Sequence, residues 1–577
     1  MREAITAETR ARLIEVARGD APADTLIENA RLVNVRSGEI HDADIAIFAG
    51  RVAGFGKYDA RETVDVGRRH VCPGLIDAHV HIESSMVTVP EFARAVVPRG
   101  TTAVVTDPHE IANVLGVPGI RYMLDSSEDL PLHVFAMASS CVPATHMETA
   151  GATLSAGDIE GLFQHPRVIG LAEVMNFPGV FLGVPEVLAK IEAAGDRPVD
   201  GHAPGLSGLP LNAYAAAGIG SDHECTRLEE AREKLRRGMH IFIREGTTAR
   251  NLRTLLPLVT PANSAYCSFC TDDRHPEDLL SEGHIDALLR LAIAEGLDPI
   301  TAIQMATINT ATYFGLRGLG ELAPGYRADL VVFEDFRDFR ARTVFVDGRV
   351  VAAGGEYLGP RLAAPPPPGS GVRVKWEAVD LSVSAEGGQR VRVIEAIPGQ
   401  IVTGQSVEEL RVEDGRLVPD PERDLLKIAV IERHRASGNV GIGFVRGFGL
   451  KRGAIASTVA HDNHNIVALG ASDEDILHAA RVVADSDGGQ VVVADGEVLA
   501  VVPLSIAGLM SALPLEEVRD RVEALGHAAR ELGGTLPDPL MTMSFLALAV
   551  IPELKITDRG LVDVTEFALV PLHHPGA

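Results

Sequence analysis

Hydrophobic and polar positions follow two different periods along this chain. Residues 6–18 carry apolar side chains at helical spacing, which predicts a short amphipathic helix. From residue 25 to residue 71, β-branched and apolar residues recur in short segments such as 32–35 and 44–48. The sequence therefore predicts a helix followed by an all-β module.

A different rhythm runs from residue 73 to residue 322. Short apolar strands alternate there with helical stretches, as at 102–106 and 168–172. Repeated βα units over roughly 250 residues are typical of a barrel of eight parallel strands surrounded by helices. We therefore predict an α/β chain whose central part is a (β/α)8 TIM barrel.

The β pattern returns after the barrel, at 328–333 and 344–351, where Asp347-Gly348 is a hairpin signal. Because this segment is similar to 47–52, we expect residues 1–72 and 323–364 to form one composite β-sandwich domain. Four prolines at 365–368 predict a linker, and residues 365–577 a C-terminal α/β domain.

Composition narrows the choice of partner. The 577 residues carry a formal net charge of −26, which argues against nucleic acid and anionic membranes, since both attract basic surfaces. The longest apolar run, 540–551, is shorter than the ~20 residues needed to span a bilayer. We expect no membrane segment and a small-molecule partner.

The N-terminal residues 1–6 lack the apolar core of a signal peptide, and five cysteines in so long a chain suit a reducing compartment. We therefore expect a cytoplasmic protein. Cys267 and Cys270 are expected to be buried thiols rather than zinc ligands, since no second pair accompanies them. Exposed β modules favour a homo-oligomer, a dimer or a tetramer.

The candidate chemistry begins at residues 74–81 (Gly-Leu-Ile-Asp-Ala-His-Val-His). On a strand, His79 and His81 point to the same face, and two neighbouring imidazoles can chelate one divalent cation. An ordinary pair of strand histidines is the alternative. In a barrel of this type, active-site residues follow the strands' carboxyl ends.

Four further metal-ligand types also follow apolar runs: Glu173, His202, His223 and Asp272. Each alone is more simply explained as a helix cap or a loop hydrogen-bonding residue. Together with His79 and His81 they make four imidazoles and two carboxylates, which suit a pair of divalent cations.

Residues 73–81 resemble the opening of the amidohydrolase superfamily, and 323–330 are similar to that superfamily's β domain. Within the superfamily, the chain most resembles the bacterial adenine deaminases over almost its whole length. The matching segments are 79–85, 106–113, 201–205, 221–224, 244–246, 271–275, 434–439 and 461–465.

This resemblance implies an enzyme that hydrolyses adenine to hypoxanthine and ammonia through a binuclear metal centre. His79 and His81 would hold one metal with Asp272, His202 and His223 would hold the second, and Glu173 would bridge them. Iron(II) or manganese(II) is favoured and zinc(II) is possible. A hydroxide that bridges the metals would attack C6 while Asp272 moves a proton to the leaving amine.

Which residue protonates the purine ring is left open, because no glutamate follows His202 closely as it does in the nucleoside deaminases. The candidates are Glu245, Glu224 and His109, although a loop hydrogen bond is equally consistent with His109. The expected substrate contacts are Asp273, Glu224, Arg244, Glu83 and His464. For Arg244 and Glu245 the alternative is a mutual ion pair, and for Asp273 it is a turn cap.

The segment 461–465 (His-Asp-Asn-His-Asn) is dense in ligand types. It predicts either an accessory metal site, or a loop lent to the active site, or a surface turn.

Two other functions compete with deamination. A sister amidohydrolase that opens a cyclic amide would need a bridging lysine, and residues 168–178 contain none. A non-catalytic scaffold would lack metal ligands, whereas all six are present.

Overall fold

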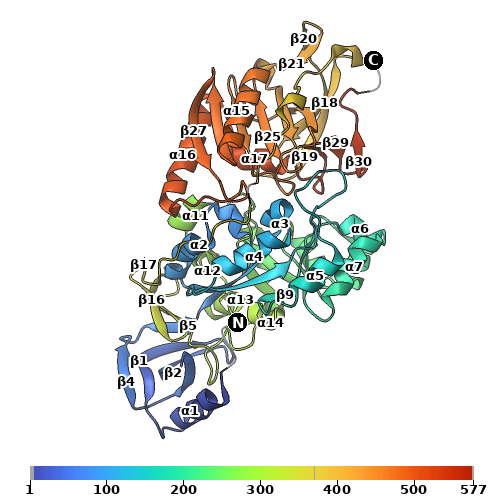
Figure 1. Ribbon diagram of the computed structural model, residues 1–577. Helices are drawn as coiled ribbons and strands as arrows, with labels where there is room; N and C mark the ends of the chain where they lie inside the picture. Colours follow the sequence, from blue (N-terminus) through green and yellow to red (C-terminus); the bar gives the residue numbers. More distant parts are fainter. Residues whose placement is uncertain (1–4, 370, 575–577) are drawn as a thin grey trace.

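The computed structural model describes residues 5–369 and 371–574. It places a barrel between a β domain, which includes helix α1, and a C-terminal α/β domain (Figure 1). Residues 1–4, which belong to the segment predicted to lack an export signal, lie outside the described residues. Within the described part of the chain, no helix is long and apolar enough to cross a membrane.

The β domain is built from both flanks of the barrel. It opens with helix α1 (Ala7–Ala17), whose cap Thr6 accepts a hydrogen bond from the Thr9 backbone at 3.1 Å. The strands form one nine-stranded sheet in which β5 pairs antiparallel with β14, bringing Val71 opposite Val332. The strands are β1 (Ala23–Asn34), β2 (Glu39–Phe48), β3 (Arg51–Phe55), β4 (Ala60–Asp65), β5 (His70–Pro73), β14 (Leu330–Phe333), β15 (Ala341–Val346), β16 (Arg349–Ala353) and β17 (Glu356–Tyr357).

Eight parallel strands form the predicted barrel, in sheets of five and three. The first and last strands meet where the backbone N–H of His81 donates to Asp272 at 3.1 Å, and that of Asp272 donates to His79 at 2.9 Å. The strands are β6 (Leu75–Val80), β7 (Thr101–Thr106), β8 (His133–Ala138), β9 (Val168–Val174), β10 (Val199–Gly201), β11 (Ser221–Asp222), β12 (His240–Arg244) and β13 (Cys267–Cys270).

These strands are almost wholly buried, because helices cover the outside of the barrel and side chains fill its interior. The main helices that cover it are α2 (Val89–Val96), α3 (His109–Leu115), α4 (Val117–Ser126), α5 (Ala156–Leu162), α7 (Pro185–Ala194), α8 (Gly208–Ala216), α9 (Leu228–Leu235), α12 (Ile285–Ala294), α13 (Pro299–Met305) and α14 (Ile308–Tyr313).

Gly74, at the start of the two-histidine segment, has a packing role. A Cβ atom there would lie 2.0 Å from Oγ1 of Thr102 on the next strand. Only glycine therefore lets β6 enter the barrel this close to β7.

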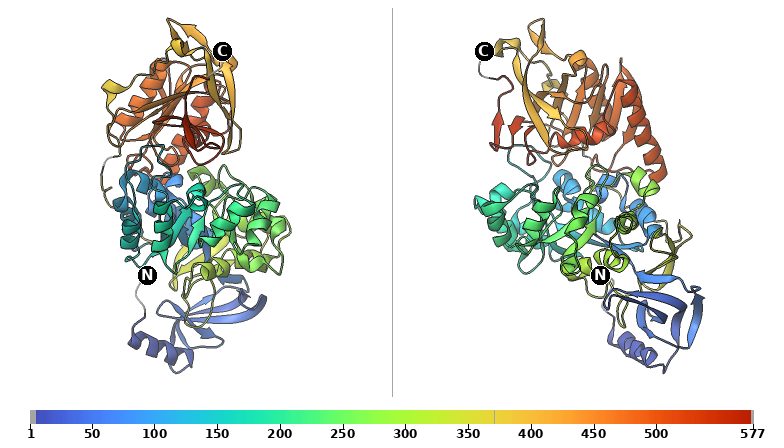
Figure 2. Two further views of the ribbon diagram at one scale, coloured as in Figure 1. Left: turned by 90° about the vertical axis from the view of Figure 1, so that its right-hand side faces the viewer. Right: turned by 180° about the vertical axis from the view of Figure 1, so that it is seen from behind.

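The C-terminal domain packs on the barrel end from which the strands' carboxyl ends emerge (Figure 2). One join is a bidentate ion pair between Arg94 of α2 and Glu516 of α16. The domain's eight-stranded sheet has the order β19-β18-β23-β22-β25-β24-β26-β27. Its strands are β18 (Arg390–Ala396), β19 (Thr403–Glu409), β22 (Leu426–Ile431), β23 (Val440–Arg446), β24 (Ala454–Ser457), β25 (Ile466–Gly470), β26 (Gly489–Ala494) and β27 (Glu497–Pro503), with helices α15 (Asp473–Asp485), α16 (Leu515–Glu531) and α17 (Pro539–Phe545) and a small sheet of β28 (Leu554–Thr557), β29 (Gly560–Asp563) and β30 (Ala568–Val570).

All five cysteines are free and buried. This confirms the prediction that Cys267 and Cys270 are buried thiols.

Candidate metal centre and active site

The six side chains predicted as metal ligands lie together at the carboxyl ends of the barrel strands. All of them are buried, with at most 7% of each residue exposed. Because parallel strands end at one rim of the barrel, residues far apart in sequence meet there. They are His79, His81, Glu173, His202, His223 and Asp272.

Glu173, the second-last residue of β9, lies between two pairs of histidines. Its Oε2 is 2.5 Å from Nδ1 of His202 and 3.1 Å from Nε2 of His223. Its Oε1 is 3.3 Å from Nε2 of His81 and 3.7 Å from Nε2 of His79. Each carboxylate oxygen thus faces one histidine pair, which is the geometry needed to bridge two cations.

Asp272 closes the arrangement on the side of the first pair. Its Oδ1 lies 3.3 Å from Nε2 of His79 and 3.1 Å from Nε2 of His81, while Nη1 of Arg244 donates to its Oδ2 at 2.7 Å. Strand β13 ends at Cys270, and Asp272 adopts a left-handed backbone conformation with φ of 58°. Because the strand does not continue, both Asp272 and Asp273 face the cavity.

The donor atoms fit divalent cations. The Nε2 atoms of His79 and His81 lie 3.1 Å apart. His202 Nε2 and His223 Nδ1 are buried without a hydrogen-bond partner among the described residues. Buried nitrogen atoms without partners are costly unless a ligand satisfies them, and imidazole nitrogen is a common ligand of divalent transition metals. Histidine–carboxylate triplets with donor atoms within 4.8 Å of one another occur on both sides of Glu173.

The charges of the centre stabilise one another. Burial alone would raise the pKa of the Glu173 carboxyl, but the imidazoles of His202 and His223 hold that pKa well below its ordinary value. Burial likewise opposes ionisation of Asp272, whereas Arg244 and the neighbouring imidazoles hold its pKa well below the ordinary range. Both carboxylates are therefore ionised and able to act as ligands.

A cavity opens beside this centre, and four more of the predicted site residues line it: His109, Glu224, Arg244 and Asp273. Arg244 forms a bidentate pair with Glu224, so the alternative of an Arg244–Glu245 pair is wrong. Ser84 donates to Asp273 at 2.5 Å, and burial together with the Asp272 charge raises the pKa of Asp273.

His109 stands at the start of α3, beside the metal centre. Its Nδ1 is 2.9 Å from Oδ2 of Asp107 and 3.4 Å from Oε1 of Glu173. Burial alone would lower the pKa of His109, but the carboxylates of Asp107, Asp462 and Glu110 raise it well above the ordinary value. The surrounding carboxylates thus favour the protonated form of His109 on the cavity wall.

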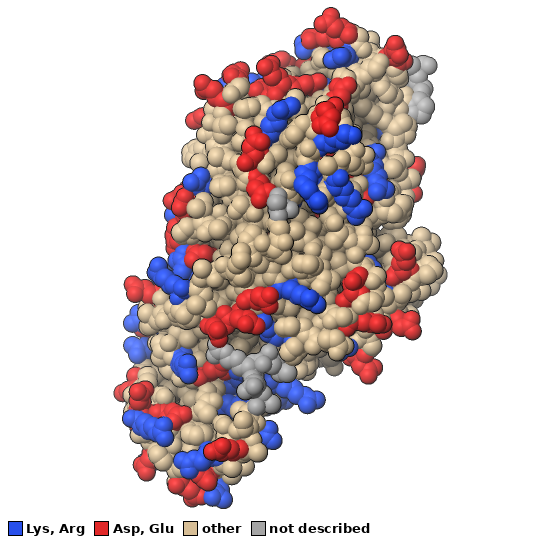
Figure 3. All heavy atoms as spheres, in the orientation of Figure 1, with Lys and Arg blue, Asp and Glu red and all other residues tan. Residues whose placement is uncertain are grey.

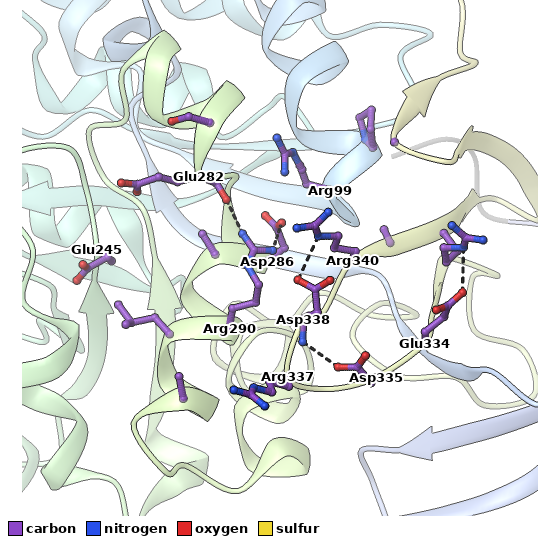
Figure 4. A pocket seen from close by; sticks show the side chains of 18 of the residues that line it. Arg99, Glu245, Glu282, Asp286, Arg290, Glu334, Asp335, Arg337, Asp338 and Arg340 are labelled. Atoms are coloured by element: carbon purple, nitrogen blue, oxygen red, sulfur yellow. Dashed lines mark hydrogen bonds and ion pairs between the residues drawn. The ribbon is translucent and has the colours of Figure 1, made fainter.

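Glu245 does not line this cavity, so its position does not support the prediction that it protonates the purine ring. Arg244 and Glu245 are adjacent at the end of β12, and adjacent strand residues point to opposite faces. Glu245 accepts a hydrogen bond from the Leu252 backbone at 3.0 Å, and it lines a separate arginine-rich hollow of the molecule (Figure 4).

Glu83 and His464 are also misplaced by the sequence prediction, because neither lines the cavity. Glu83 accepts a hydrogen bond from the backbone N–H of Ile111 in α3 at 3.2 Å, and burial raises the pKa of Glu83 to about 7. His464 is buried against the far side of the Glu110 carboxylate.

The segment 461–465 is not a surface turn, since all five of its residues are buried. It is a loop of the C-terminal domain that lends His461 and Asp462 to the cavity. The sequence pattern indicates this cluster, but the predicted substrate contact was His464, whereas the cavity is lined by His461 and Asp462.

The apolar wall of the cavity was missed altogether. It consists of Met175, Ile401, Phe545, Leu548 and Ile551. Three of these residues belong to the apolar run 540–551, which the sequence analysis considered only as a membrane segment. A long apolar run in a chain without membrane spans is a signal that such a segment covers another part of the protein.

Comparisons with known proteins agree with this architecture. Residues 70–351 match the model of the amidohydrolase family, and residues 400–568 match that of the adenine deaminase C-terminal domain. An adenine deaminase of Desulfatibacillum aliphaticivorans is 53% identical over 97% of this chain and 99% of its own length. The chain belongs to the adenine deaminase family.

Another adenine deaminase of this family, from Dehalococcoides mccartyi, is 51% identical over 97% of this chain and 98% of its own length. A crystal structure of an adenine deaminase shares 19% identity with a TM-score of 0.44, covering 57% of this chain and 99% of the other. In this family chain, the barrel and the C-terminal domain both contribute residues to the cavity.

Proposed function

We propose that this protein hydrolyses adenine to hypoxanthine and ammonia. The observation that carries the proposal is the Glu173 carboxylate between two histidine pairs, beside a cavity with one polar and one apolar wall. Relatives of near-equal length, up to 53% identical, are named adenine deaminases.

We propose further that two divalent metals are held by His79, His81 and Asp272 on one side and by His202 and His223 on the other, with Glu173 shared. Iron(II) or manganese(II) is favoured and zinc(II) is possible, because mixed nitrogen and oxygen donors suit all three. When bound, such metals polarise water and lower its pKa towards neutrality.

The chain's own residues then manage the protons. Asp272 faces the centre with Oδ1 and is held by Arg244 through Oδ2, so it is positioned to accept a proton from the attacking water and return it to the leaving amine. The hydrolysis is balanced, since one proton of the water leaves with ammonia and the other remains on the purine ring.

The partner is a small purine base. A net charge of −26 disfavours nucleic acid, and Figure 3 shows acidic and basic side chains interspersed over the face in view. Five free thiols support a cytoplasmic location. A homo-oligomeric state remains a prediction.

A substrate screen tests the proposal. Protein loaded with manganese(II) is incubated with adenine, guanine, cytosine and cyclic amides, and ammonia release is measured. We expect release from adenine and at most slow release from the others. Activity on another base with none on adenine would refute the substrate while leaving the hydrolytic chemistry standing.

A further inference from the structure

The loop 460–465 of the C-terminal domain is joined to the barrel by two side-chain hydrogen bonds. The side-chain amide of Asn463 donates to Glu148 at 3.2 Å, and that of Asn465 donates to the Thr149 carbonyl at 2.9 Å. Glu148 and Thr149 belong to the loop after β8. The loop beside the cavity is therefore hydrogen-bonded to the barrel.

The same loop is anchored within its own domain by the fully buried Arg433. Its guanidinium donates to the carbonyls of His464, Gly371 and Ala507. Because this anchor uses backbone carbonyls, it leaves the side chains of His461 and Asp462 on the cavity wall.

His461 is oriented by two contacts. Its Nδ1 lies 2.6 Å from Oε1 of Glu110, the residue after His109 at the start of α3. Its ring stacks on Phe545, with centroids 4.7 Å apart and planes inclined by 13°. Because one ring nitrogen and one ring face of His461 are held by these contacts, the direction in which Nε2 points is also fixed.

That second nitrogen, Nε2 of His461, has no hydrogen-bond partner among the described residues, although His461 is only 4% exposed. Both His461 and Phe545 line the cavity. Burial alone would lower the pKa of His461, but the Glu110 carboxylate raises it well above the ordinary value, which favours the imidazolium form with a proton on Nε2. A buried donor without an acceptor is unfavourable, and a ligand that brings an acceptor relieves this cost.

Adenine has the chemistry that this corner of the cavity lacks. Three of its four ring nitrogens, N1, N3 and N7, are uncharged acceptors at the edge of a flat aromatic ring. The apolar side chains of Phe545, Leu548 and Ile551 lie beside His461 on the cavity wall and suit the ring's face.

Several other polar groups of the cavity have partners within the protein. Glu224 is paired with Arg244, and Asp273 accepts from Ser84. His109 has Asp107 at Nδ1. On the side of the cavity that the C-terminal domain supplies, His461 Nε2 is thus a ring nitrogen that a ligand can hydrogen-bond, since it has no partner among the described residues.

We propose that His461, held by Glu110 and supplied by the C-terminal domain, donates a hydrogen bond from Nε2 to a ring nitrogen of the purine base and so positions that base at the metal centre. The inference rests on the proposed function, because it concerns the same cavity and substrate. It makes the C-terminal domain a contributor to substrate recognition.

Three isomeric deaza analogues of adenine, each with one ring nitrogen replaced by CH, test this directly. Inhibition constants of 1-, 3- and 7-deazaadenine are measured on the metal-loaded wild type, on His461→Ala and on the control His527→Ala, which removes an exposed imidazole from α16 of the same domain. In the wild type and the control, we expect one isomer to bind about 10- to 100-fold more weakly than adenine for want of the acceptor. In His461→Ala, adenine should weaken to the level of that isomer, while the ratios for the other two stay unchanged.

Retention of the full wild-type discrimination in His461→Ala would overturn the inference, and so would a wild type that distinguishes none of the three isomers. Metal content and melting temperature are measured on every variant, and His461→Asn, which keeps a shorter donor, guards against a folding defect. A wild type with three metals per chain that falls to two in His461→Ala would make His461 a metal ligand and equally overturn it.

If the wild type did not turn over adenine, the proposed function would fail. Intact turnover with unchanged discrimination in His461→Ala would defeat this inference alone.

Discussion

At the scale of single residues, the carboxylate of Glu173 determines what the centre can hold. A carboxylate has two equivalent oxygens, and here each faces a different histidine pair. An amide at the same place would keep the shape but lose the charge and turn one acceptor into a donor. The centre therefore depends on the ionised form of this one side chain.

Glu173→Gln should lower kcat/KM for adenine at least about 100-fold and reduce the bound metal, because a positive amide edge would face two ligand nitrogens. Steady-state assays with elemental analysis measure both. Glu186→Gln, an exposed change at the start of α7, is the matched control and should behave as wild type. A fully active Glu173→Gln protein with full metal content would refute the ligand assignment.

At the scale of elements, strand ends explain what the sequence could predict. The two-residue period of β6 places His79 beside His81, and the parallel barrel brings Glu173 and Asp272 to the same rim, so these positions follow from local patterns. Glu245 was misassigned because it directly follows Arg244 and points the other way.

The position of the loop 461–465 could not be predicted from its local sequence pattern. Its own sequence does not reveal that the C-terminal domain brings His461 into contact with Glu110 of helix α3, which follows the second barrel strand. Asx-rich segments are usually turns, and this one is buried only through contacts distant in sequence. Tertiary packing, and not local propensity, decides its role.

The barrel loop that holds this segment should make stability depend on pH. Burial, to which the Asp462 charge adds, raises the pKa of Glu148 to about 7 against donation from the Thr145 backbone. The folded state then holds more protons than the unfolded state between pH ~4.5 and ~7, so the Glu148 contribution is present at low pH and is lost as the pH rises through 7.

Glu148→Gln keeps a neutral side chain at every pH. Wild type and variant should therefore have similar melting temperatures near pH 5, while the variant should be the more stable near pH 8, by about 3 kcal/mol at most. Thermal unfolding followed by circular dichroism at the two pH values measures this. A wild-type advantage that grows with pH would contradict the assignment.

At the scale of the whole molecule, the active cavity lies between two domains. The barrel supplies the metal ligands, and the C-terminal domain supplies His461, Asp462 and most of the apolar wall. The ion pair of Arg94 with Glu516 is one of the contacts that join the two domains. Catalysis and domain packing are therefore linked in one interface.

Metal removal should be visible in the whole fold. Taking divalent cations from the centre leaves buried imidazoles and carboxylates without their ligand, so chelation should abolish deamination and lower the melting temperature. A metal present at 1,000 times its dissociation constant stabilises the folded state by about 4 kcal/mol. Adding back manganese(II) should restore both properties, whereas calcium, which prefers all-oxygen sites, should not. A chelated protein with unchanged activity would contradict the metal centre.

The most direct test of the central claim is to follow the oxygen atom. Manganese-loaded protein is given adenine in oxygen-18 water, and the purine product is analysed by mass spectrometry while ammonia is measured in parallel. The account predicts hypoxanthine that carries one heavy oxygen, with one ammonia released for each molecule formed. Unchanged adenine, or ammonia released without labelled hypoxanthine, would contradict it.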